Sequence, residues 1–233
     1  MNHDPWKQMF GKEQASNYDN WWQKLSPLNA ALHLLSRIVL ADVPDDANIL
    51  CVGAGTGAEL IAFAESRPHW KFVAVDTSAD MLDVCRKKVE EAGFSSRCEF
   101  HAGELGELSV DRCFHAATSI LVSQFLVDIN LRRGFFQEIL KRLVPGGYLI
   151  TADLAVPSTT AVYESLEAAW IQMQLFTGAP EEMAKASTAQ WGKLVSVLPV
   201  TEIETLISSG GFECPTLFFQ TLFIHAWYAM APL

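Results

Sequence analysis

The chain has 233 residues, half of them apolar, and its 17 basic and 27 acidic side chains give a net charge of −10. This composition is typical of one folded domain with a substantial core, and it excludes a disordered chain. The acidic balance argues against a nucleic-acid partner, because nucleic acids are bound by basic surfaces.

Five cysteines, at positions 51, 85, 98, 113 and 214, form no CxxC pair. We interpret them as thiols of a reducing compartment and expect neither a disulfide framework nor a metal site. The N-terminus lacks the apolar core of a secretory signal, and no apolar stretch is long enough to span a membrane. These features predict a cytoplasmic protein without a membrane partner.

The first half of the chain predicts a helical segment followed by alternating strands and helices. Apolar residues recur at helical spacing from Leu28 to Val39. Beyond them we expect a strand over 49–52, a helix over 58–66 and a strand over 70–75. Residues 77–80 fit a capping box that begins at Thr77, and the helix it opens should end at Gly93.

The second half continues the alternation and then changes character. Strands are predicted over 97–101, 113–119 and 148–152, with a helix before the last of them that ends at Pro145–Gly147. A second capping box, Thr201 to Glu204, should open a short helix. The apolar segments 212–219 and 222–229 are separated by only Gln220 and Thr221, so they can pair only as an antiparallel hairpin.

This order of elements predicts the fold class. Strands that alternate with helices form a mostly parallel sheet covered by helices on both faces. We therefore expect an α/β, Rossmann-like three-layer sandwich. Its seven-stranded sheet should contain about five parallel strands plus the C-terminal antiparallel hairpin.

The segment ILCVGAGTGAEL, residues 49–60, carries the strongest motif. It matches G-x-G-x-x-[GA] through Gly53, Gly55 and Ala58, and G-x-G-x-G when Gly57 is taken as the third position. Such glycines let the backbone turn sharply and let a ligand approach it, while the next helix offers unpaired N–H groups. Asp76 ends the following strand, where a carboxylate can bind a ribose diol. These features suit NAD and an adenosyl cofactor equally.

Three features favour the adenosyl cofactor. A dinucleotide needs two nucleotide-binding halves, and the chain has room for one. Glu59 stands in the first turn after the glycines, where it would oppose a pyrophosphate but not a cationic centre. The ending of strand, helix and hairpin also differs from that of a dehydrogenase. An NAD-dependent enzyme is therefore the weaker alternative.

Together the motifs resemble those of class I S-adenosylmethionine (SAM)-dependent methyltransferases over nearly the whole chain. The resemblance rests on GAGTG at 53–57, AVDTSADML at 74–82, AGEL at 102–105, LVPGGYLI at 143–150 and VTEIETLISSGGF at 200–212. SQFL at 123–126 and the late hairpin look most like the small-molecule and carboxy-SAM synthase branch.

The resemblance implies SAM as cofactor and S-adenosylhomocysteine (SAH) as product, with a division of the chain into parts. Residues 1–48 would form a helical cap, 49–153 and 200–233 the SAM-binding core, and 154–199 a helical insertion over the substrate site. The cofactor residues that it implies are Tyr18, Gly53, Ala54, Gly55, Thr56, Asp76, Thr77, Met81, Gly103, Glu104, Leu105, Ser119 and Ile120. Tyr18 resembles a lid tyrosine, and a plain packing role for it stays open.

Two departures from the family pattern bear on function. Cys51 stands where the family usually places an acid that steadies the glycine loop. Leu28 and Leu206 occupy the positions at which carboxy-SAM synthases hold the extra carboxylate with a tyrosine and an arginine, and neither leucine can do so. We therefore expect methyl transfer. A carboxy-SAM synthase-like activity and a SAM-fold binding protein without catalysis remain alternatives.

The acceptor is expected to be a small apolar or aromatic molecule, methylated by in-line displacement. Orientation of two bound reactants can contribute roughly 7–11 kcal/mol, so the sequence need not show a general base, and none is assigned. The substrate pocket is predicted to include Trp22, Tyr163, Trp170, Met173 and His225. A core role for the stripe of Tyr163, Trp170 and Met173, and a structural role for His225, stay open, as does a homodimer.

Overall fold

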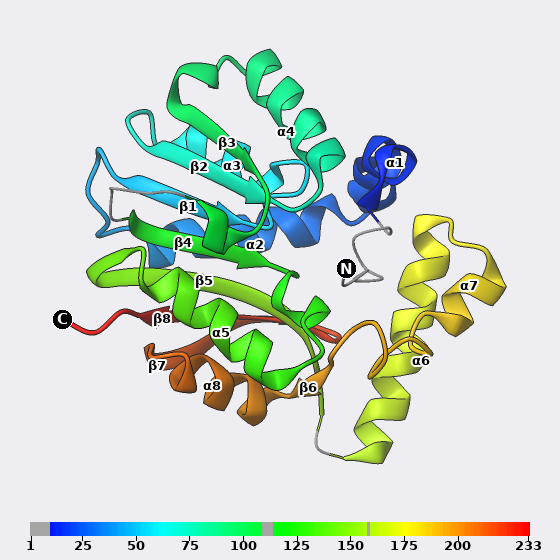
Figure 1. Cartoon of the computed structure of the whole chain (residues 1–233). Helices are drawn as coiled ribbons and strands as arrows, with labels where there is room; N and C mark the ends of the chain where they lie inside the picture. The colour runs from blue at the N-terminus through cyan, green and yellow to red at the C-terminus, as the bar shows by residue number, and fades with distance from the viewer. Residues whose placement is uncertain (1–9, 109–113, 158) are drawn as a thin grey trace.

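The computed structural model describes residues 10–108, 114–157 and 159–233, and Figure 1 shows a sheet with helices packed on both of its faces. The strands are β1 (Asn48–Val52), β2 (Lys71–Asp76), β3 (Cys98–Ala102), β4 (Phe114–Ile120), β5 (Leu143–Val156), β6 (Leu198–Pro199), β7 (Glu213–Thr221) and β8 (Ile224–Met230). Their order across the sheet is β3-β2-β1-β4-β5-β8-β7, and β6 pairs with β5 off this path.

The strand directions confirm the predicted fold class. β1 to β5 are mutually parallel, whereas β8 runs antiparallel to both of its neighbours, β5 and β7. The two-residue β6, which pairs in parallel with the end of β5, was not predicted. Two residues are too few to show the alternation of apolar and polar side chains by which a strand is recognised.

Helices cover both faces of the sheet and one of its edges. They are α1 (Lys12–Gln23), α2 (Ser26–Val39), α3 (Ala58–Ser66), α4 (Ala79–Glu91), α5 (Ile129–Leu140), α6 (Thr160–Thr177), α7 (Glu181–Ala186) and α8 (Val200–Ser209). Because successive strand residues face opposite sides, Leu50 and Val52 pack with side chains of α5 and α8. Ile49 and Cys51 pack on the other face, with side chains of α3 and α4.

Both predicted capping boxes were wrong in detail. Ser78, not Thr77, caps α4, and its Oγ accepts a hydrogen bond from the Met81 N–H at 3.2 Å. α8 begins at Val200 after Pro199, without a side-chain cap, so Thr201 lies inside the helix. Pro199 ends the pairing of β6, and its fixed φ leads directly into the helix.

Two other boundaries differ from the prediction. α5 ends at Leu140, and residues 145–147 belong to β5 rather than to the end of the helix. The hairpin turns at Leu222 and Phe223 instead of Gln220 and Thr221, with Leu222 at a φ of +50°. Apolar side chains can occupy this turn because Phe223 is fully buried beneath the helical insertion. Position 113, the predicted start of the fourth strand, lies outside the described residues.

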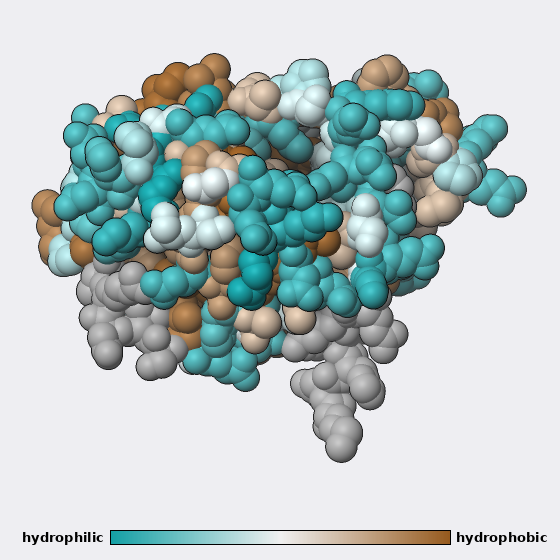
Figure 2. Space-filling model, turned by 90° about the horizontal axis from the view of Figure 1, so that it is seen from above, coloured by the Kyte–Doolittle hydropathy of each residue, from teal (hydrophilic) through white to brown (hydrophobic). Residues whose placement is uncertain are grey.

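The elements that extend beyond the sheet gather at one edge. Figure 1 shows α1, α6 and α7 together at the edge where the parallel strands end. Figure 2 looks onto the molecule from above and shows a face that is mostly hydrophilic, with scattered apolar patches. Among the described residues, no helix has the length and apolar character needed to cross a membrane.

Candidate functional site

A cavity opens at the carboxyl edge of the sheet and contains about 840 Å³ of space between protein atoms, its open mouth included. The loops after β1 to β4 and the segment that contains α1 form its walls. Its lining residues are Phe10, Tyr18, Val52, Gly53, Gly55, Val75, Asp76, Thr77, Met81, Gly103, Glu104, Leu105, Ile120, Leu121, Val122, Phe125, Leu126 and Phe135.

The glycine loop needs glycine for two separate reasons. Gly53, Gly55 and Gly57 have φ values of +67°, +53° and +81°, in the left-handed region that other residues rarely adopt. A Cβ on Gly53 would also lie 2.4 Å from Val122 Cγ2, closer than real contacts allow. The N–H of Gly53 donates to the Val75 carbonyl at 2.8 Å and so fastens the loop to β2.

Asp76 links the glycine loop to the start of α4. Its Oδ2 accepts from the Gly55 N–H and its Oδ1 from the Ser78 N–H, each at 2.8 Å. Burial raises the pKa of Asp76, while these hydrogen bonds oppose the rise. Each carboxylate oxygen keeps a lone pair for a ligand hydroxyl. Asp76 thereby steadies the loop, which is the role expected from the resemblance for an acid at position 51. Cys51 stands there instead, and burial raises the pKa of its thiol.

Part of the cavity wall beside Asp76 comes from α4 and from the loop after β3. Met81 and Thr77 contribute from the start of α4, and Leu105 and Glu104 from the loop after β3. Glu104 caps the short helical turn Leu105–Glu107, where its own N–H donates to Glu107 Oε2 at 3.0 Å. The turn fixes Leu105, which is 7% exposed, as one wall of this part of the cavity.

The loop after β4 forms the apolar end of the cavity. Leu121, the first residue after the strand, has a φ of +59° and donates its N–H to the Ala152 carbonyl at 2.7 Å. A left-handed leucine costs about 1–3 kcal/mol and persists only where surrounding contacts enforce it. Val122, Phe125 and Leu126 follow it along the cavity wall.

A buried ion pair holds this loop in place. Arg132 on α5 and Asp153 on β5 are fully buried and lie 3.2 Å apart. Ser123 donates to Asp153 at 2.8 Å and accepts from Arg132 Nε at 2.9 Å, while the Gln124 N–H donates to Asp153 at 3.0 Å. These hydrogen bonds connect Ser123 and Gln124 of the 121–126 loop with Asp153 on β5 and Arg132 on α5. The network therefore supports the conformation of the cavity wall.

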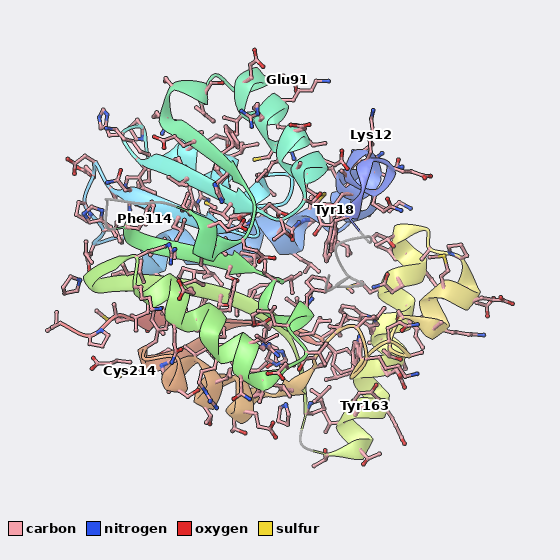
Figure 3. All side chains as sticks on the ribbon, in the orientation of Figure 1. Lys12, Tyr18, Glu91, Phe114, Tyr163 and Cys214 are labelled. Atoms are coloured by element: carbon pink, nitrogen blue, oxygen red, sulfur yellow. The ribbon has the colours of Figure 1, made fainter. Side chains whose placement is uncertain are left out.

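The N-terminal helix covers the cavity from outside. Tyr18 on α1 points toward the carboxyl edge of the sheet (Figure 3) and lines the cavity together with Phe10. Burial and the nearby Glu59 carboxylate raise the pKa of Tyr18 to about 12. Its hydroxyl therefore stays protonated at neutral pH and can donate a hydrogen bond but cannot act as a base.

The structure brings most of the predicted cofactor residues to one cavity. Those that line it are Tyr18, Gly53, Gly55, Asp76, Thr77, Met81, Gly103, Glu104, Leu105 and Ile120. Three others do not. Ala54 and Ser119 are buried behind the lining, and the hydroxyl of Thr56 donates to Asp19 on α1 at 2.7 Å.

The residues predicted for the acceptor pocket lie elsewhere. Tyr163 and Trp170 pack around Phe223 at the hairpin turn, with ring centroids 5.5 and 5.8 Å from it, and Met173 belongs to the same core cluster. Figure 3 shows Tyr163 on α6, well away from Tyr18. Trp22 on α1 packs against this cluster, and its ring centroid lies 6.4 Å from that of Tyr18. The side chain of Trp21 is outside the described part of the structure.

His225 lines a separate cavity between α6, α8 and the hairpin. It is 4% exposed, its Nδ1 lies 3.0 Å from the Phe223 carbonyl oxygen, and burial lowers its pKa. The two cavities share no lining residue. The geometry therefore gives His225 no position from which to act on a ligand in the first cavity.

Sequence reasoning missed the apolar half of the site. The missed residues are Phe10, Val52, Val75, Leu121, Val122, Phe125, Leu126 and Phe135. Two of them, Phe125 and Leu126, belong to the SQFL segment after the fourth strand, whose resemblance to the family does not by itself indicate a cavity wall. In the described part of the chain no group of His, Cys, Asp or Glu side chains could hold a metal ion.

The residues present fit an adenosyl cofactor. The glycine turn leaves room against the main chain, the Asp76 carboxylate can accept from a sugar diol, and Met81 and Leu105 offer apolar walls to a base. Glu59, which is 7% exposed, opposes a pyrophosphate but not a sulfonium.

Comparison with known proteins agrees with this geometry. Residues 49–147 match a family model described as a methyltransferase domain. A carboxy-S-adenosyl-L-methionine synthase of Campylobacter lari is 30% identical over 148 residues, which cover 62% of this chain and 60% of that protein. The chain thus spans about three fifths of the length of this relative.

Solved structures are similar in fold. A protein from Nostoc punctiforme PCC 73102 proposed to be an O-methyltransferase superposes with a TM-score of 0.65 at 20% identity, covering 88% of this chain and 57% of that one. An O-methyltransferase family 2 protein from Planctomyces limnophilus DSM 3776, solved with apigenin, gives 0.60 at 16% identity, covering 89% and 61%. Residues 49–147 therefore match a methyltransferase domain, within a chain whose fold is similar to that of these solved structures.

Proposed function

We propose that the chain binds SAM in the cavity at the carboxyl edge of the sheet and transfers its methyl group to a small apolar or aromatic acceptor. The observation that carries the proposal is the shape of one cavity. Its polar part combines the glycine turn with the Asp76 carboxylate, and its other part is walled by Leu121, Val122 and Phe125.

The chemical character of the walls supports an apolar acceptor. Phe10, Phe125 and Phe135 supply three aromatic rings to the lining, and aliphatic side chains fill the spaces between them. Such walls gain most from burying flat, apolar molecules. The Planctomyces neighbour was solved with apigenin, an aromatic molecule, which supports the same class of acceptor by analogy of fold.

The protein would contribute geometry more than acid–base chemistry. When bound, the cofactor supplies a methyl group already activated on a sulfonium. Asp76 and the glycine turn would hold the nucleoside, and the 121–126 loop would orient the acceptor beside it. Tyr18 and Phe10 would keep water out of the cavity. Orientation of this kind can contribute roughly 7–11 kcal/mol, so no general base needs to be assigned.

We assign the parts of the chain accordingly. Residues 1–48 would act as the cap, 49–153 with 200–233 as the cofactor-binding core, and 154–199 as the helical insertion. The insertion would support the site from behind, since its aromatic side chains pack on the hairpin turn at Phe223. A homodimer, a cytoplasmic location and the lack of a nucleic-acid partner stay predictions.

A carboxy-SAM synthase-like activity is the second candidate, favoured by the Campylobacter relative. Leu206 counts against it, because this residue of α8 is buried in the core and has no charge to offer a carboxylate. The third candidate, a binding protein without catalysis, would hold SAM and transfer nothing.

One experiment separates the three candidates. Purified chain is titrated with SAH in a calorimeter, its bound nucleosides are identified by mass spectrometry, and methyl-labelled SAM is then supplied with a panel of flavonoids, phenols and heteroaromatic amines. We expect SAH binding and label transfer to an aromatic acceptor. A co-purified carboxylated cofactor would favour the second candidate, and binding without transfer the third. Absence of SAH binding would contradict the proposal.

A further inference from the structure

The N-terminal helix has few fully buried side chains among its described residues. α1 contains 12 residues, and among its described side chains only that of Ala15, at 2% exposed, is buried. A helix this short is marginal on its own in water. Its position therefore depends on specific contacts with the rest of the protein, and elements of this kind open at low free energy.

Asp19 supplies two of those contacts with one carboxylate. Its Oδ1 accepts a hydrogen bond from Thr56 Oγ1 at 2.7 Å, and its Oδ2 lies 2.7 Å from Lys88 Nζ. Thr56 stands inside the glycine loop and is 2% exposed, while Lys88 lies in the last turn of α4. One side chain of α1 thus joins the two elements that form the polar part of the cavity.

Tyr18 on α1 and Phe10 just before it cover the cavity. Tyr18 precedes Asp19 in sequence, and its ring centroid lies 6.5 Å from that of Phe10. Phe10 in turn packs on Phe125 at 5.4 Å, and its carbonyl accepts from Ser78 Oγ at 2.6 Å. Movement of α1 away from the glycine loop would therefore remove two walls of the cavity together.

We propose that Asp19 is a positioning residue that latches α1 closed over the cofactor by holding Thr56 and Lys88 at the same time. The proposal rests on the proposed function, because it assigns the occupant of the cavity as an adenosyl cofactor. The latch is closed when the glycine loop presents the Thr56 hydroxyl to Asp19. A cofactor seated against Gly53 and Gly55 orders the same loop, so its binding and the closure of α1 favour each other.

The two halves of the latch differ in their response to salt. Asp19 and Lys88 are 44% and 30% exposed, so salt screens their attraction. The Thr56 hydroxyl is buried, and salt affects its bond to Asp19 less. Two further acids of the described residues, Glu59 and Asp76, act electrostatically on Tyr18, the neighbour of Asp19 on α1. Lys88 is therefore the cation that holds the Asp19 carboxylate in place.

Stopped-flow tryptophan fluorescence with SAH tests the latch. We expect Asp19→Asn, Thr56→Val and Lys88→Met to raise both the association and the dissociation rate of SAH, the latter about tenfold, as for loss of a charge-assisted hydrogen bond. Thr56→Ser and Lys88→Arg should restore slow release. The gain from Lys88→Met should shrink in 1 M salt (where the Debye length is about 3 Å), and that from Thr56→Val should persist.

Lys87→Met is the matched control. Lys87 also lies on α4 and pairs with Glu91 at 3.8 Å, but both side chains are exposed. The SAH association and dissociation rates of Lys87→Met should equal those of the wild type. Faster hydrogen exchange of the α1 amides in Asp19→Asn, at an unchanged melting temperature, should accompany the faster rates. Wild-type SAH rates in Asp19→Asn would overturn the latch alone, whereas a wild-type chain that binds no SAH would overturn the proposed function as well.

Discussion

The Oδ2 atom of Asp76 accepts a hydrogen bond from the backbone N–H of Gly55 at 2.8 Å, across the boundary between two neighbouring strands. The acid at the end of β2 and the turn after β1 are therefore one rigid unit. Two features that the sequence presents 21 residues apart become the two sides of a single binding surface. The same carboxylate orders the turn and remains open to a ligand.

This double role makes Asp76 the most sensitive position of the cofactor site. We expect Asp76→Ala to weaken SAH binding by at least ~1.5–3 kcal/mol, about 10- to 100-fold, because a charge-assisted hydrogen bond is lost and the Gly55 N–H is left without a partner. Calorimetric titration measures the change. Asp83→Ala, an exposed acid on α4, is the control and should bind SAH normally. Unchanged binding in Asp76→Ala would mean that the sugar is held elsewhere.

The contact between Gly53 and Val122 predicts a second effect. Gly53→Ala should destabilise the fold by about 1–3 kcal/mol from its φ of +67° alone, and further because its Cβ meets Val122 Cγ2 at 2.4 Å. Urea unfolding measures both contributions. The double variant Gly53→Ala with Val122→Ala should regain the stability lost to the clash but not the stability lost to backbone strain. If the two changes were simply additive, the contact would not be the cause.

Glu59 gives the protein a pH-dependent stability. Burial, with a smaller contribution from Asp76, raises the pKa of Glu59 from 4.5 to about 7. Between these values the folded state retains a proton that the unfolded chain releases, so the free energy of unfolding falls as the pH rises through this window. At 1.36 kcal/mol per pKa unit the loss above pH 7 approaches about 3 kcal/mol.

Glu59→Gln removes this titration. We expect the variant to be more stable than the wild type at pH 8.5 and nearly equal to it at pH 4.5, measured by urea unfolding at both values. Glu65→Gln, on the exposed side of the same helix, is the control and should follow the wild type. A variant that loses stability at high pH would show that the ionised carboxylate has a partner.

The aromatic cluster at the hairpin predicts stability effects without binding effects. Phe223 is fully buried between Tyr163, Trp170 and Trp191, so Phe223→Ala should cost about 3–5 kcal/mol. Tyr163→Phe should leave SAH affinity and methyl transfer unchanged, because this ring does not line the cavity. Denaturant unfolding and the labelled-SAM assay measure the two outcomes. A loss of methyl transfer in Tyr163→Phe would show that the Tyr163 side chain acts at the acceptor site after all.

The sequence by itself determined the fold class and the polar half of the site. Strand–helix alternation, the glycine turn and Asp76 are local patterns, and parallel strands place the residues after their ends at a common edge. Such signals survive without knowledge of distant contacts. The predicted strands and the residues from 53 to 105 therefore fell close to where the structure has them.

Only the tertiary structure decided what surrounds that half. Whether Tyr163 and Trp170 line a pocket or pack in a core depends on where the hairpin turn inserts Phe223, a contact between segments about 60 residues apart. The same holds for Asp19, whose partners Thr56 and Lys88 lie on two other elements. An aromatic stripe or a lone acid has the same local pattern in both situations, and packing between distant segments selects one of them.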